Sequence, residues 1–187
     1  MKKINLLFVA CMLFFMTAQS QNDNFAKGSS AVNVGLGFGN TIYGGYNMGF
    51  PSISASYELG IVEIPMGSSM HGVISAGGLA GYGGSKKDFG YGTVKINYFL
   101  LAARANYHFI FHEKFDPYAG IILGYYFGNS TVDYLPGWEW WEFSETINGP
   151  HAGGYVGARW FFTPALAAFA ELGWNVSIFT VGATFKF

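Results

Sequence analysis

Apolar residues occupy every second position in the last segment of the chain, from Phe179 to Phe187. The positions between them are small or polar: Thr180, Gly182, Thr184 and Lys186. Successive side chains of a β-strand point to opposite faces, so this period of two predicts a strand with one apolar face. An amphipathic helix would need a period near 3.6.

The same alternation recurs along the chain and predicts an antiparallel all-β fold. The predicted strands are about 31–39, 52–62, 72–82, 94–109, 118–127, 151–162, 167–174 and 178–187. Single-chain bacterial barrels have an even number of strands, and the eight predicted strands fit this rule. The expected connections on one side are 40–50, 83–93, 128–149 and a tight turn at 175–176, and on the other side 63–71, 110–116 and 163–166.

Composition decides which way the apolar faces point. Hydrophobic residues make up 51% of the chain and charged residues only 11%, against roughly 25% charged residues in soluble domains. The chain contains no run of about 18 apolar residues, which is the length that would predict a membrane helix. A water-soluble barrel would carry many Lys and Glu residues on its outer face. The sequence therefore predicts an eight-stranded, up-and-down transmembrane β-barrel whose closed ring satisfies its backbone in lipid.

The polar strand faces then line the lumen. Besides Lys186 in the last strand, they carry the charged residues Glu58, Arg104, Arg159 and Glu171, and we expect these four to form a buried ionic network. An eight-stranded barrel is just wide enough to be filled by side chains, so the network is interpreted as a structural plug. A gate, in which exchange of partners opens a narrow path, is the alternative.

The N-terminus has the features of a secretory signal peptide. Lys2 and Lys3 precede an apolar run over 6–16, and Ala18 and Ser20 fit the −3 and −1 positions of a cleavage site. We expect residues 1–20 to be removed and residues 21–187 to form the barrel domain, with 22–30 as a loose lead-in. A lipoprotein signal acylated at Cys11 fits poorly because the apolar run continues past the cysteine.

Several segments together resemble the small outer-membrane barrels of the OmpA/OmpX type, in the outer membrane protein β-barrel domain family. They are 115–120 (FDPYAG), 157–162 (GARWFF), 170–174 (AELGW) and 181–187 (VGATFKF). The resemblance implies an outer-membrane location with both termini in the periplasm. It also implies that Val181, Phe185 and Phe187 form a C-terminal signal for the barrel-insertion machinery. Because the chain ends at the last strand, no appended peptidoglycan-binding domain is expected.

Few residues suggest chemistry. Of the histidines, His71, His108, His112 and His151, only His108 and His112 have metal-ligand spacing, and these two straddle a predicted turn. The only cysteine lies in the predicted signal, so no metal or cofactor is expected. Ser144 and His151 near one rim suggest a lipid-modifying enzyme only weakly, because no nucleophile motif surrounds the serine. The net charge of −1 and the absence of a basic patch argue against nucleic acid.

An aromatic-rich segment between the fifth and sixth strands is a candidate surface-binding loop. Its aromatic residues are Tyr134, Trp138, Trp140, Trp141 and Phe143; such residues can anchor an extracellular ligand. The other interpretation is that both strands continue beyond the bilayer, with aromatics at the lipid headgroups.

The sequence thus favours a non-enzymatic protein with a structural or adhesive, surface-binding role. A narrow pore or small-solute-binding barrel is the alternative. A lipid-modifying enzyme and a secreted ligand-binding barrel are further alternatives.

Overall fold

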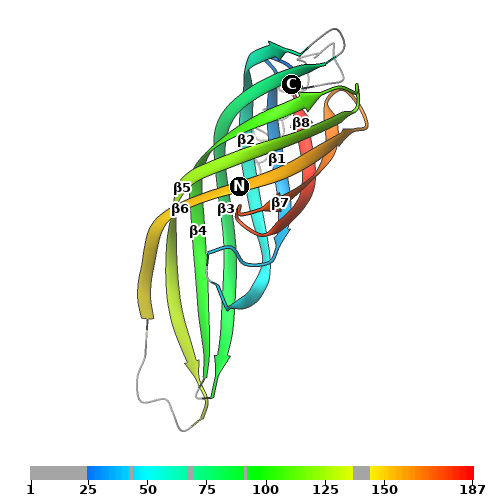
Figure 1. Cartoon of the computed structure of the whole chain (residues 1–187). Coiled ribbons are helices and arrows are strands. Elements are labelled where there is room, and N and C mark those ends of the chain that lie inside the picture. Colours follow the sequence, from blue (N-terminus) through cyan, green and yellow to red (C-terminus); the bar gives the residue numbers. More distant parts are fainter. Residues whose placement is uncertain (1–24, 43, 67–69, 91, 137–143) are drawn as a thin grey trace, which may run out of the picture.

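The computed structural model describes residues 25–42, 44–66, 70–90, 92–136 and 144–187. Eight antiparallel strands, each paired with its neighbours in sequence, close into a ring through the pairing of β1 with β8 (Figure 1). The strands are β1 (Ser30–Phe38), β2 (Asn47–Pro65), β3 (His71–Phe89), β4 (Gly92–Ile110), β5 (Phe115–Tyr134), β6 (Ser144–Phe161), β7 (Leu166–Gly173) and β8 (Phe179–Lys186). The predicted up-and-down barrel is confirmed.

The described residues form no helix long and apolar enough to cross a membrane.

Side-chain facing in the barrel wall follows the predicted alternation. On β8, Phe179 and Phe185 are 42% and 46% exposed, whereas Thr180 and Thr184 are buried. On β4, Leu101 faces outward and Arg104 inward. The wall is therefore apolar outside and polar inside, which is the polarity of a barrel that faces lipid.

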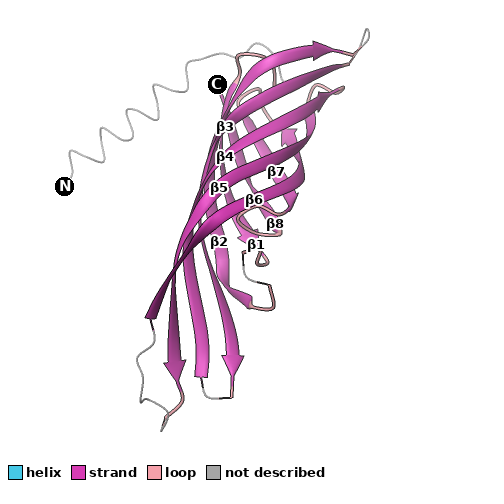
Figure 2. Cartoon of the chain, turned by 60° about the vertical axis from the view of Figure 1, so that its left-hand side comes forward, coloured by secondary structure: helices cyan, strands magenta, loops and turns pink. Residues whose placement is uncertain are grey.

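The strands differ strongly in length, which the sequence did not predict. β2 to β6 have 18 to 20 residues each, while β1, β7 and β8 have eight or nine. Most of the expected loops 83–93 and 128–149 belong to strands, since β3 runs to Phe89 and β5 runs to Tyr134. Figure 1 shows β3, β4 and β5 continuing to the lower end of the view, with β6 ending above them but still past β7 and β8, and Figure 2 shows the same extension from another side.

The physical reason is that polarity changes face along these strands. Within the apolar belt of β4, Phe99 points outward, but beyond it Asn97 and Lys95 point outward while Tyr98 and Ile96 are buried on the inner face. The alternation used to predict the strands assumes an apolar outer face, so most of the predicted strands end near the edge of the belt. The backbone ladder continues beyond that edge, with Lys95 paired to Thr131 in register.

We call this extension the projecting sheet, comprising residues 83–89, 92–98, 128–134 and 144–149. Seven residues at a rise of about 3.3 Å each carry a strand roughly 20 Å past the belt. Its outer face is polar, and an ion pair joins Lys95 to Asp133 across neighbouring strands. A polar outer face is expected for a sheet that stands in water rather than in lipid.

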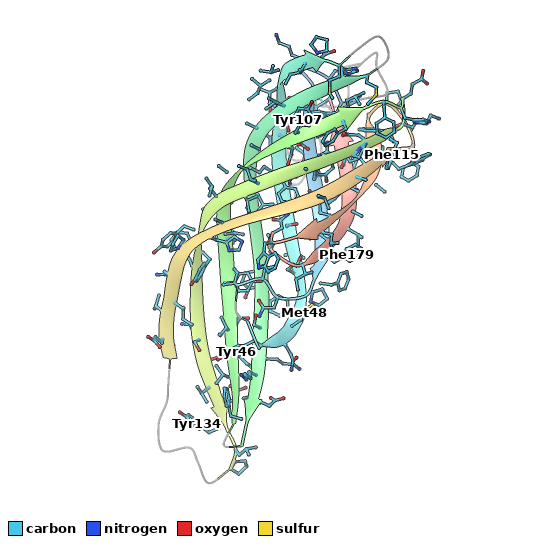
Figure 3. All side chains as sticks on the ribbon, viewed as in Figure 1. Tyr46, Met48, Tyr107, Phe115, Tyr134 and Phe179 are labelled. Carbon is cyan, nitrogen blue, oxygen red and sulfur yellow. The ribbon has the colours of Figure 1, made fainter. Side chains whose placement is uncertain are left out.

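Aromatic residues mark both edges of the apolar belt. Tyr82, Phe99 and Phe127 are register neighbours on β3, β4 and β5 where the projecting sheet begins, and all three are more than 40% exposed. At the opposite end, Figure 3 places Tyr107 and Phe115 near the rim. Two aromatic girdles around an apolar band are typical of barrels in the outer membrane.

The two ends of the barrel, which we call the near end and the far end, carry different parts of the chain. The near end carries Phe25, the start of β1 and the C-terminal Phe187, whose backbone pairs with Ser30. The far end carries the projecting sheet, with Tyr134 close to its tip (Figure 3).

Candidate functional site

The four charged residues predicted for the lumen are buried inside the barrel, each on a different strand. Glu58 (β2), Arg104 (β4), Arg159 (β6) and Glu171 (β7) are all less than 5% exposed. Arg104 Nη2 donates to Glu171 Oε1 at 2.8 Å, and Arg159 Nη2 donates to Glu58 Oε1. The structure thus brings all four into two ion pairs, which compensates the cost of desolvating each charge.

The Glu58–Arg159 pair belongs to a near-end cluster that also contains Ser75, His108 and Asp116. Arg159 Nη1 lies 3.3 Å from Asp116 Oδ2, so one guanidinium bridges two carboxylates. His108 Nδ1 lies 2.8 Å from Asp116 Oδ1, and its Nε2 lies 3.0 Å from Ser75 Oγ. Every member of the cluster therefore has a polar partner.

Ser75, His108 and Asp116 follow the hydroxyl–imidazole–carboxylate order of a hydrolase triad. Ser75 and His108 are completely buried, however, and the Ser75 hydroxyl donates to Glu58 Oε2 at 3.1 Å. A nucleophile has to meet its substrate, so the position of Ser75 favours packing over catalysis.

The Arg104–Glu171 pair forms a second, far-end cluster. Tyr118 Oη donates to Glu171 Oε1 at 2.8 Å and Asn175 Nδ2 donates to Glu171 Oε2 at 2.7 Å, while Arg104 Nη1 donates to Ser56 Oγ at 2.8 Å. Both oxygens of the buried carboxylate are thereby satisfied.

Asn106 and Tyr155 connect the two clusters. Asn106 Nδ2 donates to Glu58 Oε2 at 2.6 Å, and its amide oxygen accepts from Tyr155 Oη. The Tyr155 ring in turn lies against the guanidinium of Arg104, with 5.1 Å between Arg104 Cζ and the ring centroid. One polar network therefore fills the lumen from the near-end cluster to the far-end cluster.

Each arginine has one nitrogen atom without a hydrogen-bond partner among the described residues. This atom is Nε in both Arg104 and Arg159. Arg159 also lies over the ring of Tyr118, with 4.8 Å from Cζ to the centroid. Such aromatic contacts are favourable for a desolvated guanidinium.

The near end of the lumen is closed by Phe25, which the sequence placed in a loose lead-in. That expectation is wrong. Phe25 is completely buried and stacks on His108 at 4.5 Å between ring centroids. The surrounding residues 22–30 are mostly polar, so no periodicity marked this aromatic residue as part of the packed interior.

The far end is closed by the connection between β7 and β8, which was expected to be a tight turn at 175–176. Residues 174–178, which we call the inward turn, place Asn175, Val176 and Ser177 inside the barrel, each at most 3% exposed. The Val176 carbonyl accepts from Tyr98 Oη at 3.0 Å. Thr41 Oγ1 donates to the Asn175 carbonyl at 2.8 Å, so the turn is held from two sides.

A hollow of about 780 Å³ lies on the outer wall of the barrel. Small outward residues of β2, β3 and β4 form its floor, and larger apolar side chains border it. Its lining includes Ala55, Gly78, Ala80, Ala103 and Leu123. The hollow opens on the apolar outer wall and does not include the buried polar network.

Sequence reasoning missed Asp116, Tyr118 and Asn175 as members of the network. Asp116 and Tyr118 share the inward parity of Gly120 and Ile122 on β5, so extending that strand by two residues would have found Asp116. Asn175 lies in a connection without periodicity, and no sequence signal placed it in the lumen.

The remaining candidate chemical residues are not brought together. Ser144 and His151 lie at positions of opposite parity on β6, so they belong to opposite faces. His112 stacks on Trp160, and His71 lies 3.8 Å from Glu63. The described residues contain no group of three or more His, Cys, Asp or Glu residues arranged to hold a metal ion.

The predicted surface-binding loop is described only in part, whereas the predicted insertion signal is described in full. Tyr134 ends β5, but Trp138, Trp140, Trp141 and Phe143 lie outside the described residues. In the proposed insertion signal, Phe185 is 46% exposed on the outer wall, while Val181 and Phe187 are partly exposed.

Comparison with known proteins places the fold. No family model and no curated protein matches the sequence. Among solved structures, the chain is similar to Ail, the attachment invasion locus protein of Yersinia pestis, with 14% sequence identity and a TM-score of 0.51. The match covers 86% of this chain and 99% of Ail. The structure of Ail in complex with the heparin analogue sucrose octasulfate gives the same values. The N-terminal β-barrel domain of Pseudomonas aeruginosa OprF is 13% identical with a TM-score of 0.46, over 87% and 100%. The chain therefore has the fold of the small eight-stranded outer-membrane barrels, as its sequence motifs indicated.

Proposed function

We propose that this protein is a non-enzymatic outer-membrane barrel that presents the projecting sheet to the cell exterior as a surface for binding proteins. The observation that carries the proposal is the reversal of polarity along β3 to β6. It divides each strand into a part suited to lipid and a part suited to water. The near end, which carries Phe25 and the C-terminal Phe187, then faces the periplasm.

One edge of the projecting sheet is open along β6. Strand β6 pairs with β5 from Ser144 onward. It pairs with β7 only over residues 155–161. Among the described residues, no strand pairs with the second side of β6 over residues 144–153. An unpaired edge can accept an extended segment of another polypeptide as an added strand.

The direction of the unused backbone groups follows from one hydrogen bond. The Gly154 carbonyl accepts from Trp174 N, on the β7 side. Residues two apart on a strand point their backbone groups to the same side, so Thr146, Asn148 and Ala152 offer theirs to the open edge. Pro150, which lacks an N–H, shares this parity, as expected for a proline on an edge.

The open edge is tested by removing one donor. Thr146→Pro deletes an N–H that points away from β5, whereas Thr146→Val keeps the N–H and the side-chain shape. The probe is a labelled peptide of residues 127–134, the natural antiparallel neighbour of this part of β6. We expect binding to the parent and to Thr146→Val, and loss of binding in Thr146→Pro. Equal binding by all three proteins would contradict strand addition.

The likeness to Ail supports an adhesive role only at the level of the fold. Ail is described as an attachment invasion protein and has been crystallised with a heparin analogue. The location of the present chain is tested by fractionation and by gel mobility with and without boiling. We expect an outer-membrane protein whose folded form migrates differently from the boiled form; recovery in soluble extracts without detergent would contradict the proposal.

A narrow pore is the alternative function, and the filled lumen argues against it. If the network is a plug, Glu171→Gln leaves the conductance of planar bilayers unchanged. If it is a gate, the same change raises ion leakage. We expect the first result, because Phe25 and the inward turn close the lumen on either side of the network.

A further inference from the structure

Residues 25–29 form a compact turn that directs the chain back into the near end of the barrel. Ser29 N donates to the Ala26 carbonyl at 3.1 Å, and Ala26 N donates to Ser29 Oγ at 3.1 Å. Gly28 has a φ of 86°, which suits the third position of a type II turn and favours glycine there. The segment is thus ordered by its own hydrogen bonds.

This turn sits on a site in β2 that only a glycine provides. Gly28 N donates to the Gly60 carbonyl at 2.8 Å, and Gly60 N donates to the Ser29 carbonyl at 2.9 Å. A Cβ at Gly60 would lie 2.3 Å from the Ala26 carbonyl oxygen, and the register of β2 shifts immediately after Gly60. The strand is therefore shaped to let the backbone of the turn approach.

Phe25, at the inner end of the turn, covers the near-end cluster. Its ring stacks on His108 and lies 5.4 Å from Cζ of Arg159. Together with Ala31, Val73 and Ile110 it forms a small apolar group in which every member is at most 2% exposed. Without this ring, charged and polar groups would face the near-end opening.

We propose that residues 25–29 are a displaceable N-terminal plug, which closes the near end of the lumen and keeps water from the near-end cluster. The barrel ring closes through β1 and β8 without it, so the plug can leave without unpairing a strand. The proposal concerns the lumen rather than the surface function, and it holds whichever side of the membrane the near end faces.

The test measures water access behind Phe25. Ala31→Cys places a thiol at a fully buried position of the apolar group, and a small water-soluble methanethiosulfonate reports its accessibility. The full chain is used, and the same chain without Ala31→Cys corrects for labelling at Cys11. Only the folded fraction is scored, as identified by its gel mobility before boiling.

Two independent changes displace the plug. Phe25→Ala removes the ring, and Gly60→Ala retains Phe25 but blocks the approach of the Ala26 carbonyl. In either background the Phe25 ring no longer covers position 31. We therefore expect the rate of thiol labelling to rise at least about tenfold, because water no longer has to wait for the plug to open. Gly78→Ala is the matched control, since a Cβ there meets only the Ala102 carbonyl oxygen at 3.8 Å.

Rapid labelling in the parent barrel would overturn the proposal, because the near end would then be open with the plug present. Slow labelling in both variants would overturn it as well. So would an equal rise in Gly78→Ala, which would point to general breathing of the wall.

Discussion

The carboxylate of Glu171 is buried and accepts hydrogen bonds from three donors, on Arg104, Tyr118 and Asn175. Arg104 lies on β4, Tyr118 lies on β5 and Asn175 lies in the inward turn. A single carboxylate therefore ties together parts of the barrel that are far apart in sequence, and its charge balances that of Arg104.

Replacing Glu171 by Gln should destabilise the barrel. The change keeps the size of the side chain but leaves the guanidinium of Arg104 buried without its carboxylate, at a cost of about 3–5 kcal/mol. The measurement is the free energy of unfolding in urea, followed by tryptophan fluorescence in lipid vesicles.

The control for this change is Asp133→Asn on the projecting sheet. Asp133 also pairs with a cation, Lys95, but the two side chains are 56% and 51% exposed. An exposed pair contributes at most about 1 kcal/mol. Equal losses in both variants would show that burial of the Glu171 pair carries no special weight.

A charge on the outer wall should also be costly. Val181 points outward on β8, between Leu36 and Ala170 in register, so Val181→Lys places an ammonium group in lipid at about 2–4 kcal/mol near the midplane. The matched control is Asn97→Lys, which adds the same group to the polar outer face of β4, where its register partners Gly84 and Asn129 are uncharged, and should change stability by less than about 0.5 kcal/mol. Refolding titrations in vesicles give both values, and a neutral Val181→Lys would reverse the assignment of faces.

At the scale of elements, the inward turn depends on a glycine in the facing strand. A Cβ at Gly81 would lie 2.4 Å from Cγ2 of Val176. Gly81→Ala should therefore push the turn outward and cost about 1–3 kcal/mol, as overpacking does. Unfolding in urea measures the loss, and Gly154→Ala, where the nearest atom lies at 3.8 Å, should be tolerated. A Gly81→Ala variant as stable as the parent would contradict the tight packing of the turn.

The alternation of residues predicted the strands and their facing because the belt enforces one polarity on each face. The charged residues of the lumen were found for this reason, because each lies on the polar face of its strand: Glu58, Arg104, Arg159 and Glu171. Strand length was not predictable in the same way, since Ile96 and Phe99 are both apolar but face opposite sides of β4. Phe25 and Asn175 entered the lumen from irregular segments, where no period exists to assign a face.

At the scale of the whole molecule, the processing of the N-terminus is open to direct measurement. Lys2, Lys3, the apolar run and the small residues Ala18 and Ser20 predict a mature chain that begins at Gln21. Mass spectrometry of the membrane-extracted protein tests this. An intact Met1 or a lipid on Cys11 would contradict the prediction.

The reversal of polarity along β3 to β6 has a consequence for assembly. If the projecting sheet lies outside, its polar outer face has to cross the bilayer during insertion. That face carries two lysines and two aspartates in its charged positions, Lys86, Lys95, Asp88 and Asp133, so its charges sum to zero. Asp133 contacts Lys95, and Asp88 accepts from Thr93 on the neighbouring strand. Hairpins that form before insertion would thus carry these groups across as partly neutralised neighbours, and the energetic barrier to translocation would be lower than for the same residues inserted one strand at a time.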